Sequence, residues 1–181
     1  MKVDVKIDNA LLEKAIIFGT EKHAGQVRKG NNTPYILHPL RLLTHLVLVK
    51  PDSKNLIMSM IVLVLHDVVE DCEVSLDEIA REFGHTIAGL VGELTTDPEE
   101  SAKVGKAQYL LTKMLGMTSY ALRYKLIDRY DNVCEMKALS ELTIQKTKKD
   151  TLFILDGLEK RKLTGTHKKL IKMIRKVLNK Y

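Results

Sequence analysis

The 181-residue sequence has no Trp, few other aromatic residues and only four Pro. With aromatic residues at 5% of the chain, the core is expected to consist of aliphatic and Met side chains. Proline breaks helices, so its rarity leaves long segments free to be helical. No segment keeps the apolar and polar alternation of a half-buried strand. We therefore predict an all-α fold, with residues 1–181 forming one compact domain.

The sequence also lacks the marks of a secreted or membrane protein. Its two cysteines, Cys72 and Cys134, have no metal-ligand spacing and are expected to be reduced thiols. The first residues contain no apolar segment of the signal-peptide type. The apolar run over residues 56–65 is too short to span a bilayer. These absences predict a soluble, cytoplasmic protein with no membrane partner.

The net charge of +6 is concentrated in two places, residues 146–149 and residues 160–180. Such charge could bind an anionic partner, including nucleic acid. No zinc finger, RNA-binding motif or aromatic platform accompanies it. We therefore interpret the C-terminal segment as a basic amphipathic helix over residues 166–180 with a solvated polar side, rather than as a nucleic-acid surface. The sequence leaves a homo-oligomer open.

Residues 57–71 join a long apolar run to the polar residues His66, Asp67, Glu70 and Asp71. A helix that is apolar on nearly every side is buried on all sides. We expect the helix to continue through residue 71, so that His66 lies over Glu70, and Asp67 over Asp71. Burying these groups is costly unless a partner such as a cation compensates them. From this stretch alone, a metal site and an ordinary charged helix end both remain open.

Two other segments carry matching side chains. His38 directly precedes Pro39, a residue suited to the first turn of a helix. Asp128 stands among apolar neighbours in another predicted helix. With His66 and Asp67 they form a set of two imidazoles and two carboxylates. Such a mixed set suits Mn²⁺, Fe²⁺ or Zn²⁺ better than Mg²⁺ or Ca²⁺.

Six short motifs follow one another along the chain: residues 28–30 (RKG), 33–39 (TPYILHP), 65–71 (LHDVVED), 76–79 (LDEI), 83–84 (FG) and 125–132 (KLIDRYDN). In this order they resemble the HD superfamily of metal-dependent phosphohydrolases and, more closely, the hydrolase domain of the RelA/SpoT family. The resemblance covers about residues 15–158. No synthetase half follows, so the chain resembles a stand-alone small alarmone hydrolase, the arrangement of the metazoan SpoT homologue.

The resemblance implies an all-α HD-domain fold and Mn²⁺-dependent removal of the 3′-pyrophosphate from guanosine tetraphosphate or pentaphosphate. By motif position it implies the metal ligands His38, His66, Asp67 and Asp128, the catalytic pair Glu70 and Asp71, and the substrate contacts Arg28, Lys29 and Asn132. Lys106 is a further candidate for binding phosphate oxygens. Glu70 can orient or deprotonate the attacking water.

The segment after Asp128 departs from the family pattern. The family commonly has Met-Arg-Thr or Leu-Arg after the Asn, whereas Asn132 is followed by Val-Cys-Glu at residues 133–135. Ile127 replaces the usual Ala, and Asp131 the usual His or Tyr. The metal set is therefore retained while the nucleotide pocket is altered. Two alternatives stay open: an HD phosphohydrolase acting on a nucleoside monophosphate, a cyclic nucleotide or NADPH, and a non-catalytic nucleotide-binding regulator.

Overall fold

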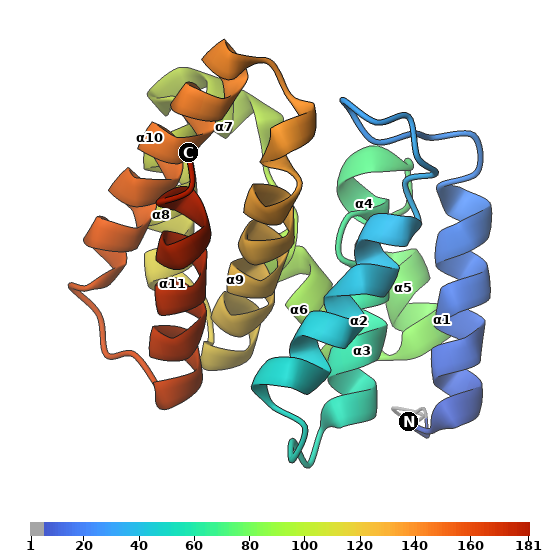
Figure 1. Ribbon diagram of the computed structural model, residues 1–181. Helices are drawn as coiled ribbons and strands as arrows, with labels where there is room; N and C mark the ends of the chain where they lie inside the picture. Colours follow the sequence, from blue (N-terminus) through green and yellow to red (C-terminus); the bar gives the residue numbers. More distant parts are fainter. Residues whose placement is uncertain (1–5) are drawn as a thin grey trace. The chain divides into compact units, whose positions relative to one another are not determined.

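A computed structural model describes residues 6–181 (Figure 1). These residues form eleven α-helices and one short 3-10 helix. Within this part of the chain, the β-type pairing is limited to one isolated bridge, between Val27 and Pro34. The all-α prediction is thus confirmed. No helix in the described range is long and apolar enough to cross a membrane.

The contacts within the chain divide it into two compact units. Of the described residues, the first unit contains 6–28 and Asn32–Thr95, and the second contains Lys29–Asn31 and Thr96–Tyr181. Each unit is described below by itself. The single domain over residues 1–181 stays a prediction.

The first unit is built around one buried helix. Its helices are α1 (Asn9–Lys22), α2 (Leu37–Val49), α3 (Leu56–Leu65), α4 (Val68–Asp71), α5 (Leu76–Phe83) and α6 (His85–Leu94). Helix α3 packs against α1, α2 and α6. Its last five residues, Ile61 to Leu65, have no exposed surface. The predicted burial of this helix on all sides is confirmed, because each of its faces meets another helix.

The predicted continuous helix through residue 71 is wrong. Helix α3 ends at Leu65, and His66 and Asp67 form a turn before α4. The His66 Nδ1 atom lies 2.8 Å from the carbonyl oxygen of Leu63. In a continuous helix that oxygen would accept the backbone N–H of Asp67. The imidazole takes the place of this backbone donor, so the side chain of His66 helps to end the helix.

A short hairpin connects α1 to α2. The Arg28 N–H donates to the Thr33 carbonyl at 2.8 Å, and the Tyr35 N–H donates to the Gln26 carbonyl at 2.9 Å. Asn32 adopts a left-handed conformation with φ of 54°, which Asn tolerates better than most residues. The hairpin delivers Tyr35 and then His38 to the start of α2.

The second unit contains α7 (Pro98–Val104), α8 (Lys106–Gly116), α9 (Ser119–Cys134), a 3-10 helix (Met136–Ala138), α10 (Glu141–Leu158) and α11 (Gly165–Leu178). Helix α9 packs against α11, and α8 against α10. Gly157 suits the second contact, because a Cβ atom there would overlap the Leu111 side chain. Helix α11 lies where the basic amphipathic helix was predicted, with Leu170, Ile174 and Leu178 fully buried.

Candidate metal centre

His38, His66 and Asp67 come together in the first unit. One ligand atom from each lies within 4.8 Å of the others. His38 begins α2, and both imidazoles are 1% exposed. Their ring centroids are 5.3 Å apart. The turn between α3 and α4 therefore places Asp67 beside two buried histidines, a donor set that suits a divalent transition metal.

The hydrogen bond of His66 fixes its tautomer. A carbonyl oxygen can only accept, so Nδ1, which faces the Leu63 carbonyl, carries the proton in the neutral ring. The Nε2 atom then presents a lone pair. It is buried, has no hydrogen-bond partner and lies 2.8 Å from Oδ2 of Asp67. Two electron-rich atoms at this distance require a cation or a proton between them, so the residues present fit a metal ion.

Tyr35, to which the sequence analysis assigned no role, also contacts this carboxylate. Its hydroxyl donates to Asp67 Oδ2 at 2.5 Å. Its ring meets the His38 ring edge-on, with centroids 5.8 Å apart. Tyr35 belongs to the motif of residues 33–39, but the sequence does not indicate which side chain of this motif contacts Asp67.

Glu70 and Asp71 lie on α4, one turn beyond His66 and Asp67. Both are on the exposed side of this helix. Partial burial raises the pKa of Asp71, and the negative charges of Asp67 and Glu70 raise it further. The first unit thus places the two predicted catalytic acids close to the Asp67 carboxylate.

The predicted phosphate-binding residues fall in both units. Arg28 is half-buried in the first unit, and its guanidinium carbon lies 5.8 Å from the centre of the Tyr35 ring. Lys29 and Lys106 belong to the second unit, and both are exposed. Arg28 therefore contacts the aromatic ring that also neighbours His38.

Asp128 and Asn132 pair with each other on α9, in the second unit. The Asn132 amide donates to Asp128 Oδ1 at 2.6 Å. The Lys125 ammonium lies 3.4 Å from Asp128 Oδ2, and both side chains are buried. The three-residue spacing of Lys125 and Asp128 could have revealed this pair in the sequence. The set of four metal ligands stays a prediction, since three of them belong to the first unit and Asp128 to the second.

Comparison with known proteins places these motifs in a family. A family model described as "HD domain" matches residues 15–162. A guanosine-3′,5′-bis(diphosphate) 3′-pyrophosphohydrolase of Aquifex aeolicus is 32% identical over 152 residues, which are 79% of this chain and 20% of that protein. The enzyme of the same name from Spiroplasma citri is 35% identical over 127 residues, covering 67% of this chain and 16% of that protein.

Other similar proteins carry a different name or a solved structure. A GTP pyrophosphokinase of Streptomyces coelicolor is 32% identical over 157 residues, which are 83% of this chain and 18% of that protein. The chain spans about a fifth of the length of these relatives. A solved structure of a metazoan ortholog of SpoT, described as hydrolysing ppGpp, is similar with a TM-score of 0.82 at 22% identity, over 97% of this chain and 98% of that one.

The family model covers α2, α3, α4 and α9, and so includes all four residues predicted to bind metal. The solved structure has the same fold over nearly the whole chain. The matched range, residues 15–162, is more than half of the chain and therefore shows the family. The chain belongs to the HD-domain family.

Proposed function

We propose that this protein is a metal-dependent hydrolase that removes the 3′-pyrophosphate from guanosine tetraphosphate or pentaphosphate. The observation that carries the proposal is the His38–His66–Asp67 cluster, in which a buried, unpartnered imidazole nitrogen faces a carboxylate oxygen. The names of the Aquifex and Spiroplasma relatives support the choice of substrate. A cytoplasmic location and a small nucleotide as the partner belong to the same proposal.

The cofactor that fits the proposal best is Mn²⁺, with Fe²⁺ or Zn²⁺ as alternatives. His38, His66 and Asp67 would hold it, and Asp128 would be the fourth protein ligand. Two nitrogen and two oxygen donors suit these ions better than Mg²⁺ or Ca²⁺. When bound, a divalent cation offsets the negative charge of the phosphates and lowers the pKa of a water molecule.

Glu70 and Asp71 would transfer protons during the hydrolysis. Glu70 is exposed on α4, where its carboxylate can orient the water and accept its proton. Asp71, the second acid of the pair, would be available to donate a proton to the departing oxygen.

The basic residues and Asn132 would bind the substrate. Arg28 can form paired hydrogen bonds to phosphate oxygens, while Lys29 and Lys106 can contribute single positive charges. Asn132, whose amide donates to Asp128, would contact the nucleotide.

A second candidate is an HD phosphohydrolase that acts on another nucleotide. The specific observation is the Val-Cys-Glu sequence at residues 133–135, in place of the Arg-containing segment of the family. Val133 is fully buried, so it cannot replace a polar contact to the nucleotide. A non-catalytic nucleotide-binding regulator would show binding without turnover in the same assay.

The test is product release from guanosine tetraphosphate in Mn²⁺, beside nucleoside monophosphates, cyclic nucleotides and NADPH. Pyrophosphate release from the guanosine tetraphosphate alone is the expected result. Asp67→Asn should remove it, while Asp77→Asn, an exposed acid at the start of α5, should not. Turnover of a different nucleotide would favour the second candidate, and binding without any turnover would overturn the assignment as an enzyme.

A further inference from the structure

The side chain of Tyr35 shares an atom with the candidate metal centre. Its hydroxyl donates to Asp67 Oδ2 at 2.5 Å, and this same oxygen lies 2.8 Å from Nε2 of His66. We infer that Tyr35 is a positioning residue, whose hydroxyl holds the Asp67 carboxylate in the orientation that binds metal. The inference rests on the metal centre of the proposed function and adds a residue to which that proposal gives no role.

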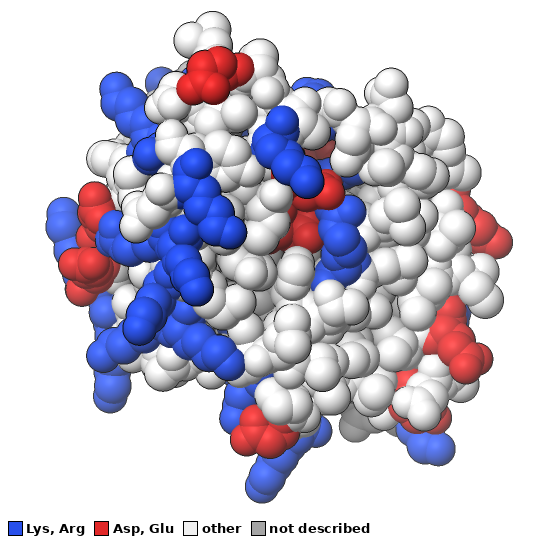
Figure 2. Space-filling model, viewed as in Figure 1, with Lys and Arg blue, Asp and Glu red and all other residues white. Residues whose placement is uncertain are grey.

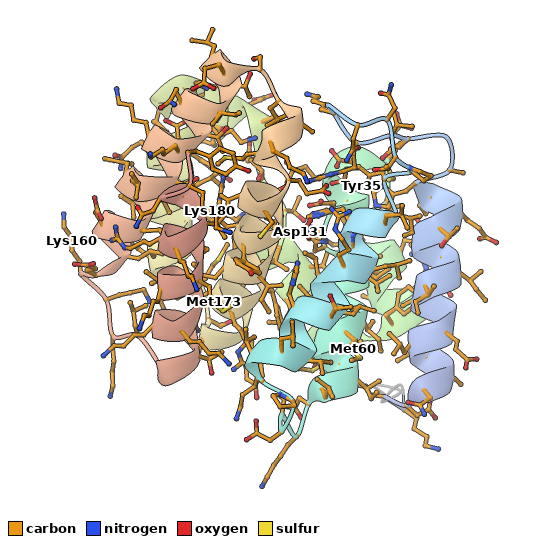
Figure 3. The ribbon with its side chains drawn as sticks, viewed as in Figure 1. Tyr35, Met60, Asp131, Lys160, Met173 and Lys180 are labelled. Atoms are coloured by element: carbon orange, nitrogen blue, oxygen red, sulfur yellow. The ribbon has the colours of Figure 1, made fainter. Side chains whose placement is uncertain are left out.

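The ring of Tyr35 is held from several sides in the first unit, where Figure 3 labels it. The His23 ring stacks on it at a tilt of 34°, with centroids 4.7 Å apart. The His38 ring meets it edge-on, and the Arg28 guanidinium carbon lies 5.8 Å from its centre. Its backbone N–H is fixed to Gln26. Because ring and backbone are both fixed, the position of the hydroxyl is set before any metal binds.

Gln26 ties this arrangement to α4. Its side-chain oxygen lies 2.8 Å from Nδ1 of His23, the histidine that stacks on Tyr35. Its side-chain amide donates to the backbone carbonyl of Asp71 at 3.0 Å. The hairpin and the short helix that follows Asp67 are thus joined at two places, by Gln26 to Asp71 and by Tyr35 to Asp67. Relative movement of the two segments would break both bonds.

Each of the two adjacent ligands has an outer partner, since His66 has the Leu63 carbonyl and Asp67 has Tyr35. Such partners fix the orientation of ligands, and their loss typically weakens metal binding about 10–100-fold.

The experiment is a calorimetric titration of the metal-free protein with Mn²⁺. Tyr35→Phe keeps the ring, and with it the contacts to His23, His38 and Arg28, while it removes the hydroxyl. Tyr109→Phe is the matched control, because the Tyr109 hydroxyl also takes part in a hydrogen bond, with the Asp97 N–H at 2.9 Å, but in the second unit. The expected result is a Kd for Mn²⁺ raised about 10–100-fold in Tyr35→Phe and unchanged in Tyr109→Phe.

Two measurements separate positioning from a general loss of structure. The Tm of metal-free Tyr35→Phe should match that of metal-free Tyr109→Phe. The hydrolysis rate of Tyr35→Phe should recover most of its loss at saturating Mn²⁺, because the variant lacks affinity rather than a reacting group. A Kd within twofold of the wild-type value, or an equal weakening in Tyr109→Phe, would overturn the inference.

The inference and the proposed function can fail separately. If the wild-type chain binds Mn²⁺ and Tyr35→Phe weakens that binding while no nucleotide is turned over, the proposed function is wrong and the role of Tyr35 stands. If guanosine tetraphosphate is hydrolysed and the Kd of Tyr35→Phe is unchanged, the role of Tyr35 is wrong and the function stands. A wild-type chain that binds no Mn²⁺ would contradict both.

Discussion

Each compact unit places a carboxylate beside a buried polar side chain, and the two sites differ in what faces the carboxylate. In the first unit, the Nε2 atom of His66 is buried with no hydrogen-bond partner and faces an oxygen of Asp67. In the second unit, the buried carboxylate of Asp128 already accepts from Asn132 and lies beside the Lys125 ammonium. The Asp67 oxygen faces an imidazole nitrogen, whereas the Asp128 carboxylate faces an ammonium group.

This difference indicates different energetic roles for the metal in the two units. In the first unit a cation would relieve an unfavourable contact between two electron-rich atoms, so its binding should stabilise the fold. In the second unit Asp128 has a compensating charge without metal, so the unit should fold with or without it. A metal ion that takes Asp128 as a ligand must compete with Lys125 for the same carboxylate.

The largest effect is expected from Asp128, the predicted metal ligand in the second unit. Asp128→Ala should lower the hydrolysis rate by about 100-fold or more, at least the upper end of the loss seen for outer partners of metal ligands. Its helix content by circular dichroism should stay that of the wild type, because Ala favours helices. Asp150→Ala is the control, since Asp150 pairs with the exposed Lys146 on α10 at 3.8 Å. Full activity in Asp128→Ala would remove Asp128 from the ligand set.

The next effect is expected from removing the metal, which tests whether the metal stabilises the first unit. A chelator should abolish hydrolysis and lower Tm, and Mn²⁺ at about 100 times its Kd should restore about 2.7 kcal/mol of stability. His66→Ala should lose this stabilisation, because it removes the unpartnered nitrogen. Thermal unfolding with and without Mn²⁺ measures both effects. Equal stabilisation of wild type and His66→Ala would place the metal elsewhere.

A smaller effect is expected from His167, a buried histidine of the second unit that has partners on both nitrogens. Its Nδ1 accepts from the Thr164 N–H at 3.3 Å, and its Nε2 donates to the Ser119 carbonyl at 2.9 Å. Burial lowers its pKa below the ordinary value of 6.5, and the charges of Arg123 and Arg161 lower it further. Both nitrogens of His167 thus have hydrogen-bond partners, whereas the Nε2 atom of His66 has none.

The sign of the pH dependence follows from this lowered pKa. Below pH 6.5 the unfolded chain binds a proton at His167 that the folded chain resists, so stability is complete above that pH and falls as the pH decreases. His167→Gln should cost about 1 kcal/mol at pH 8 through its altered hydrogen bonds and should show a weaker dependence on pH. Urea unfolding at pH 8 and pH 5 measures both. An identical pH dependence in the variant would exclude His167 as its source.

The fold and the apolar positions could be predicted from the sequence because they depend on local patterns. Residues 61–65 are apolar on every side, and this alone implies contacts on all faces of α3. The end of α3 could not be predicted, because it depends on the His66 imidazole taking the Leu63 carbonyl from the backbone. Sequence spacing describes residues on an unbroken helix and cannot show that a side chain interrupts it.

The candidate site could be predicted in part. His38, His66 and Asp67 were proposed together from motifs, and the structure brings these three together. The partners that hold them, Tyr35 and the Leu63 carbonyl, were not found. Their contacts depend on the path of the hairpin before α2, and no spacing in the sequence encodes that path.

The smallest effect is expected from the most basic part of the second unit. Figure 2 shows Lys and Arg side chains gathered over the region where α11 lies in Figure 1. Residues 160–181 contain nine of them and no acidic residue, and Lys168, Lys172 and Lys176 are exposed one turn apart. The apolar side of α11 is buried against α9, so its free side offers charge without aromatic or apolar contacts.

Charge alone binds nucleic acid through counterion release, which weakens steeply with salt. We therefore expect weak binding of duplex DNA at low salt and none at about 150 mM, where charges beyond about 8 Å are screened. Replacing Lys168, Lys172 and Lys176 with Gln should remove the low-salt binding and leave hydrolysis unchanged, because these side chains bind neither metal nor substrate in the proposed function. If the wild-type protein still binds DNA at about 150 mM salt and the variant does not, the expectation is wrong. The second unit would then have a specific anionic partner.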